Sequence, residues 1–138
     1  MEQRINKLKM LGFIEDQIQR IVSVFPNSIK LRPERLQESF DNLLEQGFTR
    51  EETIFCIVHT PSIFGKKIET VKKQILLYKK IFGVDYKSIV LKNPRRMIQG
   101  YNKTDTRYEI LKKRGITNGE LLEDIFLSES QFDRKYKN

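Results

Sequence analysis

The sequence predicts an all-α protein, a right-handed-type α-solenoid of about three helix-turn-helix repeats with 3₁₀ turns and a C-terminal helical cap. Three observations support this prediction. Glycines recur at intervals of 35 and 36 residues, and prolines recur at intervals of 35 and 33 residues. No alternation of apolar and polar residues lasts for five positions, so no half-buried β-strand is indicated. The recurring positions are Gly12, Gly47 and Gly83, and Pro26, Pro61 and Pro94.

Apolar side chains keep a fixed register relative to each proline, which is the third observation. They stand at the same offsets before and after all three prolines. We expect these positions to form the core that neighbouring repeats share. Cys56 occupies one of them, so it is read as a small core residue in preference to a reactive thiol. The matching sets are Ile21, Cys56 and Ile89; Ile29, Phe64 and Met97; Phe40, Ile75 and Tyr108; and Leu43, Tyr78 and Leu111.

The first repeat is predicted over residues 11–45, after a short helix over residues 2–11. Its first helix opens on acidic residues, which suit the positive end of a helix dipole, and stops at Pro26. A tight turn follows, and Pro33 fits the first position of the next helix. That helix is expected to end at Gly47 and to bury Leu36, Phe40, Leu43 and Leu44.

The second repeat is predicted over residues 46–81. Thr49 and Glu52 have the spacing of a capping box at the start of its first helix. A connecting turn follows Pro61, and a long second helix comes after it. The seven-residue spacing of Lys66, Lys73 and Lys80 places them on one exposed edge of that helix.

The third repeat is predicted over residues 82–116, and the cap over residues 117–138. Asp85 is expected to cap a two-turn helix that ends before Pro94. The next helix is expected to begin at Thr104 or Asp105. In the cap, Ser128 is expected to begin the last helix.

Composition places the 138-residue chain in the class of single globular domains. No apolar run approaches the ~18 residues that a transmembrane helix needs. No secretory or organelle-targeting peptide is visible at the N-terminus. A single cysteine excludes a disulfide framework within the chain and a cysteine-based zinc cluster.

The net charge of +8 is unevenly distributed along the sequence. Residues 1–45 are neutral overall, residues 46–81 carry +4, residues 82–116 carry +6 and residues 117–138 carry −2. The basic excess therefore belongs to the second and third repeats. Such a gradient indicates a polyanion partner for one stretch of surface. The alternative is that a lysine-rich repeat protein is simply well solvated.

Three segments resemble the mitochondrial transcription termination factor (mTERF) family. Residues 47–64 run from Gly-Phe-Thr to Pro-Ser-Ile-Phe, and residues 11–26 run from Leu-Gly-Phe to Pro. The end of the chain is similar to the closing segment of plant-type members, with Arg-Tyr-Glu-Ile-Leu-Lys-Lys-Arg-Gly-Ile over residues 107–116 and Ser-Glu-Ser-Gln-Phe over residues 128–132. Single repeats are weak motifs, but three in register with this terminal segment are fairly specific.

The resemblance implies an α-solenoid whose basic concave face binds double-stranded DNA or structured RNA. It implies a role in transcription termination or regulation, or in handling ribosomal RNA. It also implies the mitochondrion or plastid as the site of action, with the cytoplasm as the alternative. This chain has about three repeats, fewer than is usual for the family, and we expect it to act as a monomer.

The candidate nucleic-acid-binding residues are basic side chains that stand in the turns or directly after them. In a stacked array, equivalent positions line up along one surface, so these residues are expected to form a continuous basic strip. The structural alternative is a solvated charged face. The candidates are Lys66, Lys67, Lys73, Lys92, Arg95, Arg96, Lys103 and Arg107.

Little in the sequence points to catalysis, and no cofactor or metal is expected. His59 is the only histidine, and a position near a helix end explains it better than a catalytic role. No metal-ligand spacing and no glycine-rich phosphate loop is present. Tyr86 and Tyr101 fall outside the core pattern, which leaves contact with a base or sugar open. A protein–protein interaction scaffold is the alternative to nucleic-acid binding.

Overall fold

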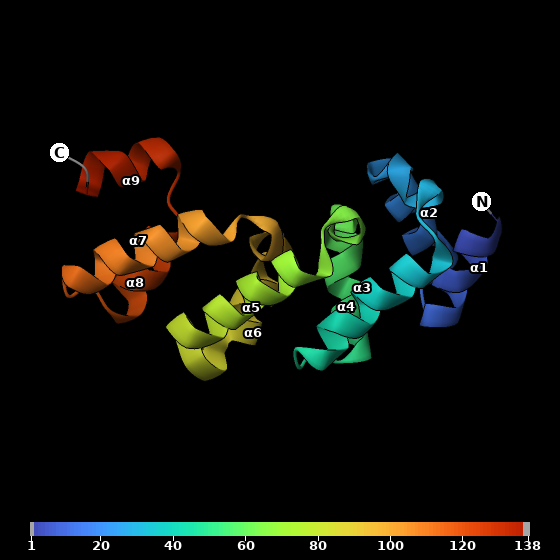
Figure 1. Cartoon of the computed structure of the whole chain (residues 1–138), viewed down its shortest axis with the longest axis horizontal. Helices are drawn as coiled ribbons and strands as arrows, with labels where there is room; N and C mark the ends of the chain where they lie inside the picture. Colours follow the sequence, from blue (N-terminus) through green and yellow to red (C-terminus); the bar gives the residue numbers. More distant parts are fainter. Residues whose placement is uncertain (1, 137–138) are drawn as a thin grey trace. The chain divides into compact units, whose positions relative to one another are not determined.

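The computed structural model describes residues 2–136, which form α-helices joined by short turns and 3₁₀ helices, with no β-strand in that range (Figure 1). The predicted all-α fold class is therefore confirmed. The chain divides into two compact units, Met1–Ile98 and Gln99–Asn138, which are described in turn. No helix within the described range is both long and apolar enough to cross a lipid bilayer.

The first unit consists of two rows of helices. The helices α1, α3 and α5 lie side by side in one row, and α2, α4 and α6 form the other. The 3₁₀ helix η2 packs on α3, and η4 packs on α5, so each of these turns packs against a helix of the preceding repeat. The elements are α1 (Glu2–Leu11), α2 (Glu15–Val24), η1 (Pro26–Lys30), α3 (Pro33–Glu45), α4 (Arg50–His59), η2 (Pro61–Gly65), α5 (Ile68–Phe82), η3 (Gly83–Asp85), α6 (Tyr86–Lys92) and η4 (Pro94–Ile98).

Prolines explain where the helices of the second row end. Proline has no backbone N–H, and its ring disfavours the α conformation at the residue before it. Phe25, Thr60 and Asn93 precede the three prolines, and their ψ angles of 77°, 70° and 90° lie outside the helical region. After each of these residues, the chain forms a 3₁₀ helix that begins at the proline. The predicted turns after the prolines are confirmed.

Most of the predicted core positions in the first unit are buried. Ile21, Cys56, Phe40, Ile75 and Tyr78 are each at most 1% exposed. Burial, with a smaller contribution from the charge of Glu52, raises the pKa of the Cys56 thiol to about 12. At neutral pH the thiol is therefore protonated and unreactive, as expected for a packing residue.

Three predicted helix starts are confirmed. Pro33 occupies the first turn of α3, and Thr49 and Glu52 form a reciprocal capping box at α4. Ser128 and Gln131 exchange equivalent hydrogen bonds at α9. The predicted cap at Asp85 is wrong, because its backbone is helical and its side chain makes no capping hydrogen bond. The 3₁₀ helix η3 already leads into α6, so no extended N-cap residue is present there.

Three predicted core residues, Ile29, Leu44 and Tyr108, lie outside the core, and Ile29 in η1 is half-buried. The inward stripe of α3 is Leu36, Phe40 and Leu43, and Leu44, one residue further round the helix, is 36% exposed. In α7, Thr104, Arg107 and Leu111 face inward and Tyr108 is half-buried beside them. An arginine thus occupies the place where an apolar residue was expected.

The second unit contains α7 (Tyr101–Lys113), α8 (Asn118–Ile125) and α9 (Glu129–Tyr136). The helix α7 begins earlier than predicted because Gly100, with φ of 106°, redirects the chain into it. Burial of the Asp124 carboxylate opposes ionisation, but hydrogen bonds from Lys135 and Tyr136 outweigh that effect, so the pKa of Asp124 is lowered. These bonds join α8 to α9 and hold the predicted cap segment together.

Ile75 and Leu76 provide a matched test of the helix phase in α5. Ile75 is fully buried, whereas the adjacent Leu76 is 45% exposed. We expect Ile75→Ala to lower the free energy of unfolding by about 2–5 kcal/mol. Leu76→Ala should change it by less than about 0.5 kcal/mol. Urea unfolding followed by circular dichroism measures both, and equal losses would show that the helix phase is wrong.

Candidate nucleic-acid interface

Side chains from one repeat donate hydrogen bonds to backbone carbonyls at the helix ends and turns of the next repeat. The last carbonyls of any helix lack partners within that helix. In the first unit, Arg4 Nε of α1 donates to Leu31 O after η1 at 2.7 Å, and Tyr78 Oη of α5 donates to Arg96 O in η4 at 2.7 Å. Arg35 of α3 donates to Phe64 O of η2 at 3.3 Å, and also to the carbonyl of Lys66. These bonds fix each turn against the long helix before it.

A second set of hydrogen bonds explains two of the recurring glycines. The first residue of α4, Arg50, donates to the carbonyl of Leu11, and the first residue of α6, Tyr86, donates to Gln46 O at 2.7 Å. Leu11 and Gln46 directly precede Gly12 and Gly47.

Glycine suits these two places for steric reasons. Gly12 and Gly47 have φ of 113° and 104°, which L side chains rarely adopt. A Cβ atom on Gly47 would also lie 2.5 Å from the Tyr86 hydroxyl. The periodic glycine therefore leaves room for the donor from the next repeat.

Arginines supply most of these donors. Besides the bonds already described, Arg20 Nε donates to Val58 O at 2.8 Å, and Arg114 Nη2 donates to Tyr136 O at 3.0 Å. At least seven of the ten arginines in the sequence donate to a backbone carbonyl. The planar guanidinium presents several fixed donors, which suits it to this role better than the single ammonium of lysine.

Two predicted binding residues belong to this structural group. Arg107 is only 6% exposed, its Nη1 donates to Ile125 O at 3.1 Å and to Leu127 O at 2.5 Å, and its guanidinium lies over the Phe132 ring. Burial lowers the pKa of the guanidinium, partly opposed by the charges of Asp133 and Glu129. The donors of Arg107 face the protein, which favours a structural role over the predicted contact with nucleic acid.

Arg96 is half-buried and shares this structural role. Its Nη1 donates to Ile89 O, in the middle of α6, at 2.9 Å. Burial lowers the pKa of its guanidinium, and the tyrosine Tyr78 opposes that effect. Arg96 therefore stabilises the turn η4. Its exposed neighbour Arg95 is the better candidate for contact with a ligand.

The other six predicted residues are exposed, and five of them belong to the first unit. The edge of this unit where η1, η2 and η4 lie is called the turn edge here. Lys66 and Lys67 directly follow η2, and Arg95 lies within η4, with Lys92 at the end of the preceding helix. Lys73 stands one turn and a half into α5 on its exposed side. The sixth, Lys103, is an exposed residue of α7 in the second unit.

The turn edge carries two further cations that the prediction did not include. Lys30 ends η1 and Arg32 lies two residues beyond it, and both side chains are exposed. Arg32 occupies the place in the first repeat that Lys67 occupies in the second, and Lys30 stands one residue before the place of Lys66. Their similar offset from Pro26 is the sequence signal for them, although the first repeat as a whole has no net charge.

The outer faces of α3 and α5 carry opposite charge. The outer positions of α3 are Glu34, Glu38, Asp41 and Glu45, and the equivalent positions of α5 are Glu69, Lys73, Leu76 and Lys80. Acidic side chains repel phosphates, so the outer face of α3 is unsuited to a polyanion. The face of α5 is the one that favours binding.

Tyr86 and His59 make contacts that favour packing over binding or catalysis. The Tyr86 ring packs edge-on against Phe48, with its hydroxyl bonded to Gln46, so it is a packing residue and not a base-stacking platform. Tyr101 is half-buried at the start of α7. The His59 ring packs against the Phe55 ring at a tilt of 56°, with centroids 4.2 Å apart. Among the described residues, no three His, Cys, Asp or Glu side chains could together hold a metal ion.

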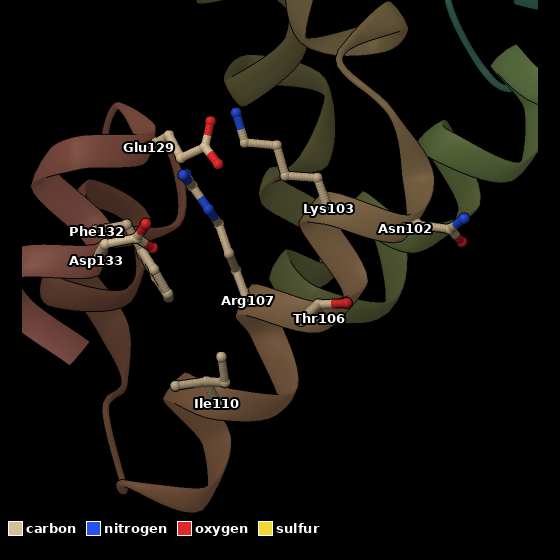
Figure 2. A pocket seen from close by; sticks show the side chains of 8 residues that line it. All are labelled: Asn102, Lys103, Thr106, Arg107, Ile110, Glu129, Phe132 and Asp133. Atoms are coloured by element: carbon tan, nitrogen blue, oxygen red, sulfur yellow. The ribbon is translucent and has the colours of Figure 1, made fainter. Parts of the chain in front are cut away.

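A cleft in the second unit lies between α7 and α9, with a volume of about 380 Å³. Figure 2 shows Lys103 and Arg107 reaching into it from α7, with Glu129 and Asp133 facing them from α9. Opposite charges alternate across this cleft, so it offers no net attraction for an anion.

Comparison with known protein families identifies a match over most of the chain. The sequence profile of the mTERF family matches residues 1–133 of the 138-residue chain. A comparison with curated protein sequences finds no match. The match covers both compact units and all the candidate residues described above.

Two arginines test the division between structural and exposed cations. Arg107→Gln removes the donor for two carbonyls, and we expect the free energy of unfolding to fall by about 1–3 kcal/mol. Arg95→Gln, at an exposed turn position, should change it by less than about 0.5 kcal/mol. Chemical denaturation of the two variants gives the comparison. A stable Arg107→Gln variant would show that the buried guanidinium is dispensable to the fold.

Proposed function

The chain belongs to the mTERF family, whose members are nucleic-acid-binding helical-repeat proteins and generally not enzymes, and on that premise we propose how this chain binds. The proposed ligand is duplex DNA or structured RNA. The proposed interface is the turn edge of the first unit together with the exposed side of α5. Within the family's range of roles, we propose transcription termination or regulation, or the handling of ribosomal RNA.

The observation that carries this proposal is the placement of five exposed cations on neighbouring elements. Lys66, Lys67 and Lys73 belong to the η2–α5 segment, and Lys92 and Arg95 belong to the α6–η4 segment that packs beside it. Four of the five are lysines, which engage phosphates as point charges. The chemistry therefore favours contact with the backbone of a nucleic acid over reading of its bases.

The size of the turn edge suits a short stretch of duplex. A helix with its side chains is about 10 Å across, so the three turns of stacked repeats span about 20 Å from first to last. Duplex DNA carries one charge per about 1.7 Å of its axis, so such a stretch presents about twelve phosphates. Five cations can therefore each find a phosphate. Lys30 and Arg32 extend the same edge at its first turn.

A protein–protein scaffold is the competing proposal for the same surface. A scaffold that binds through apolar contacts would show little dependence on salt, whereas phosphate contacts release counterions and depend on it steeply. The two proposals are therefore separated by a salt titration.

Five phosphate contacts predict a slope of log affinity against log salt of about −4.5 on B-form DNA. Raising salt from 50 to 200 mM should then weaken binding roughly 500-fold. Fluorescence anisotropy with a labelled duplex of about 20 base pairs at several salt concentrations measures the slope. Parallel titrations with duplex RNA and single strands identify the preferred ligand. Binding that is absent at 50 mM salt, or insensitive to salt, would favour the scaffold.

Two pairs of adjacent lysines test where the interface lies. Lys66 and Lys67 directly precede α5, whereas Lys112 and Lys113 are the last two residues of α7. All four side chains are exposed. Changing Lys66 and Lys67 to Gln should reduce the slope by about 1.8, because each lost phosphate contact contributes about 0.9. The same change at Lys112 and Lys113 should leave the slope within about 0.5 of the parent value. Equal effects would mean that binding follows net charge and not the turn edge.

A further inference from the structure

The helix α4 departs from the repeat pattern on its outer side. Its inner stripe, Thr53, Cys56 and Ile57, is buried in the core. A second apolar stripe, Ile54, Phe55 and Val58, faces away from it, and Phe55 is 42% exposed. At the positions equivalent to Phe55, α2 has Arg20 and α6 has Ser88, so the fold accepts a polar residue there. A helix that is apolar on both sides usually has both sides covered.

The start of α2 shows a second departure beside this stripe. Ile14 occupies the N-cap of α2 and is 63% exposed, although Ser, Thr, Asp and Asn are the favoured N-cap residues. The equivalent residue before α4 is Thr49, which makes the expected capping bond. The Ile14 side chain therefore makes no capping hydrogen bond, and it exposes an apolar surface to solvent. Its side chain serves neither the core nor the helix start.

Both departures meet in one cleft between α2 and α4. Ile14, Ile54, Phe55 and Val58 line it together, and its volume is about 320 Å³. An apolar cavity of about 150 Å³ accepts a benzene molecule, so this cleft has room for about two large apolar side chains. Two side chains one turn apart on a helix have the spacing to fill it.

The charge around the cleft is acidic. Glu51 lines it, and Glu15 and Asp16 follow Ile14 in the first turn of α2, all three exposed. Arg20 and Arg50, on the same two helices, keep their positive charge but hold it against the carbonyls of Val58 and Leu11. With three carboxylates against two guanidinium groups, this corner has an excess of one negative charge, on a chain of net charge +8. The exposed carboxylates attract basic side chains and repel phosphates.

We propose that this cleft docks an amphipathic helix of a partner protein, with two apolar side chains one turn apart and lysine or arginine on the flank that faces Glu15, Asp16 and Glu51. This site lies on the second row of helices and does not depend on the turn edge binding nucleic acid. The chain would then bind a protein partner and a nucleic acid through different elements of the same unit. The partner is identified by its chemistry, a basic amphipathic helix.

A pair of designed peptides tests the proposal. Both are helical peptides of about four turns with leucines one turn apart, and they differ only in carrying lysines or glutamates beside the leucines. The ¹⁵N-labelled full chain is titrated with each, and backbone amide shifts are followed by NMR. We expect the lysine peptide to shift amides of α4 and the start of α2, with at least tenfold tighter binding than the glutamate peptide.

Two variants taken from the repeat itself locate the site. Phe55→Ser installs the residue of the equivalent position in α6, and Ile14→Thr installs that of the equivalent N-cap. Each should weaken the lysine peptide at least tenfold. Thermal unfolding should be unchanged for Phe55→Ser and unchanged or raised for Ile14→Thr, because threonine is the better cap. Leu76→Ser, at an exposed leucine of α5, is the control and should bind as the parent does.

Several outcomes would overturn this proposal. The first is equal binding of both peptides, or binding of neither at millimolar concentration. The second is retention of peptide binding by the Phe55→Ser variant. The third is self-association of the parent that Phe55→Ser abolishes, measured by sedimentation, since it would assign the cleft to a second copy of the chain. None of these readouts involves nucleic acid, so they are independent of the salt titration.

Discussion

Unpaired carbonyls at helix ends are the constraint on which this structure depends. A protein built from short helices has many ends, and each leaves carbonyl oxygens without partners in its own helix. Here donors from the adjacent repeat meet that need, as Arg35 does for the turn η2 and Tyr86 does for the end of α3. Cross-repeat hydrogen bonds therefore fix the register between repeats, in addition to apolar packing. The glycines at the helix ends give these donors room to approach.

This use of arginine separates two kinds of positive charge. Guanidinium groups such as those of Arg20 and Arg107 lie against the protein and hold its elements together. Lysines such as Lys66 and Lys67 remain exposed along the turns. The total charge of the chain therefore overstates how many cations can meet a ligand. A basic surface built mainly of lysines suits the backbone of a nucleic acid, because an ammonium attracts phosphate without demanding a particular orientation.

Repetition also makes departures from the pattern informative. Each repeat shows what the fold needs at a given position, so a residue that differs from its equivalents without a packing reason calls for another explanation. Charge on the outer face of α3 and α5 is one such difference, with Glu38 in the place of Lys73. The apolar residues Ile14 and Phe55 are another. The first separates surfaces that repel and attract phosphate, and the second marks a cleft on the other row of helices.

The sequence by itself determined the helical fold class, the turns after the prolines and most of the core. These features follow from local chemistry: proline ends a helix, glycine adopts positive φ, and apolar residues at a fixed offset share a face. Ile75 and Cys56 were predictable for that reason. The family resemblance, too, was carried by residues that recur in the sequence, and the profile match bears it out.

Only the tertiary structure decided which charged and aromatic residues are available to a ligand. Arg107 and Tyr86 looked exposed in the sequence, yet each donates to a carbonyl that lies 18 to 40 residues away in the chain. Periodicity can place a side chain on a helix face but cannot reveal the acceptor that another element brings to it. The same limit hid the cleft, because Ile14 and Phe55 are separated by a whole repeat and meet only when α2 packs beside α4.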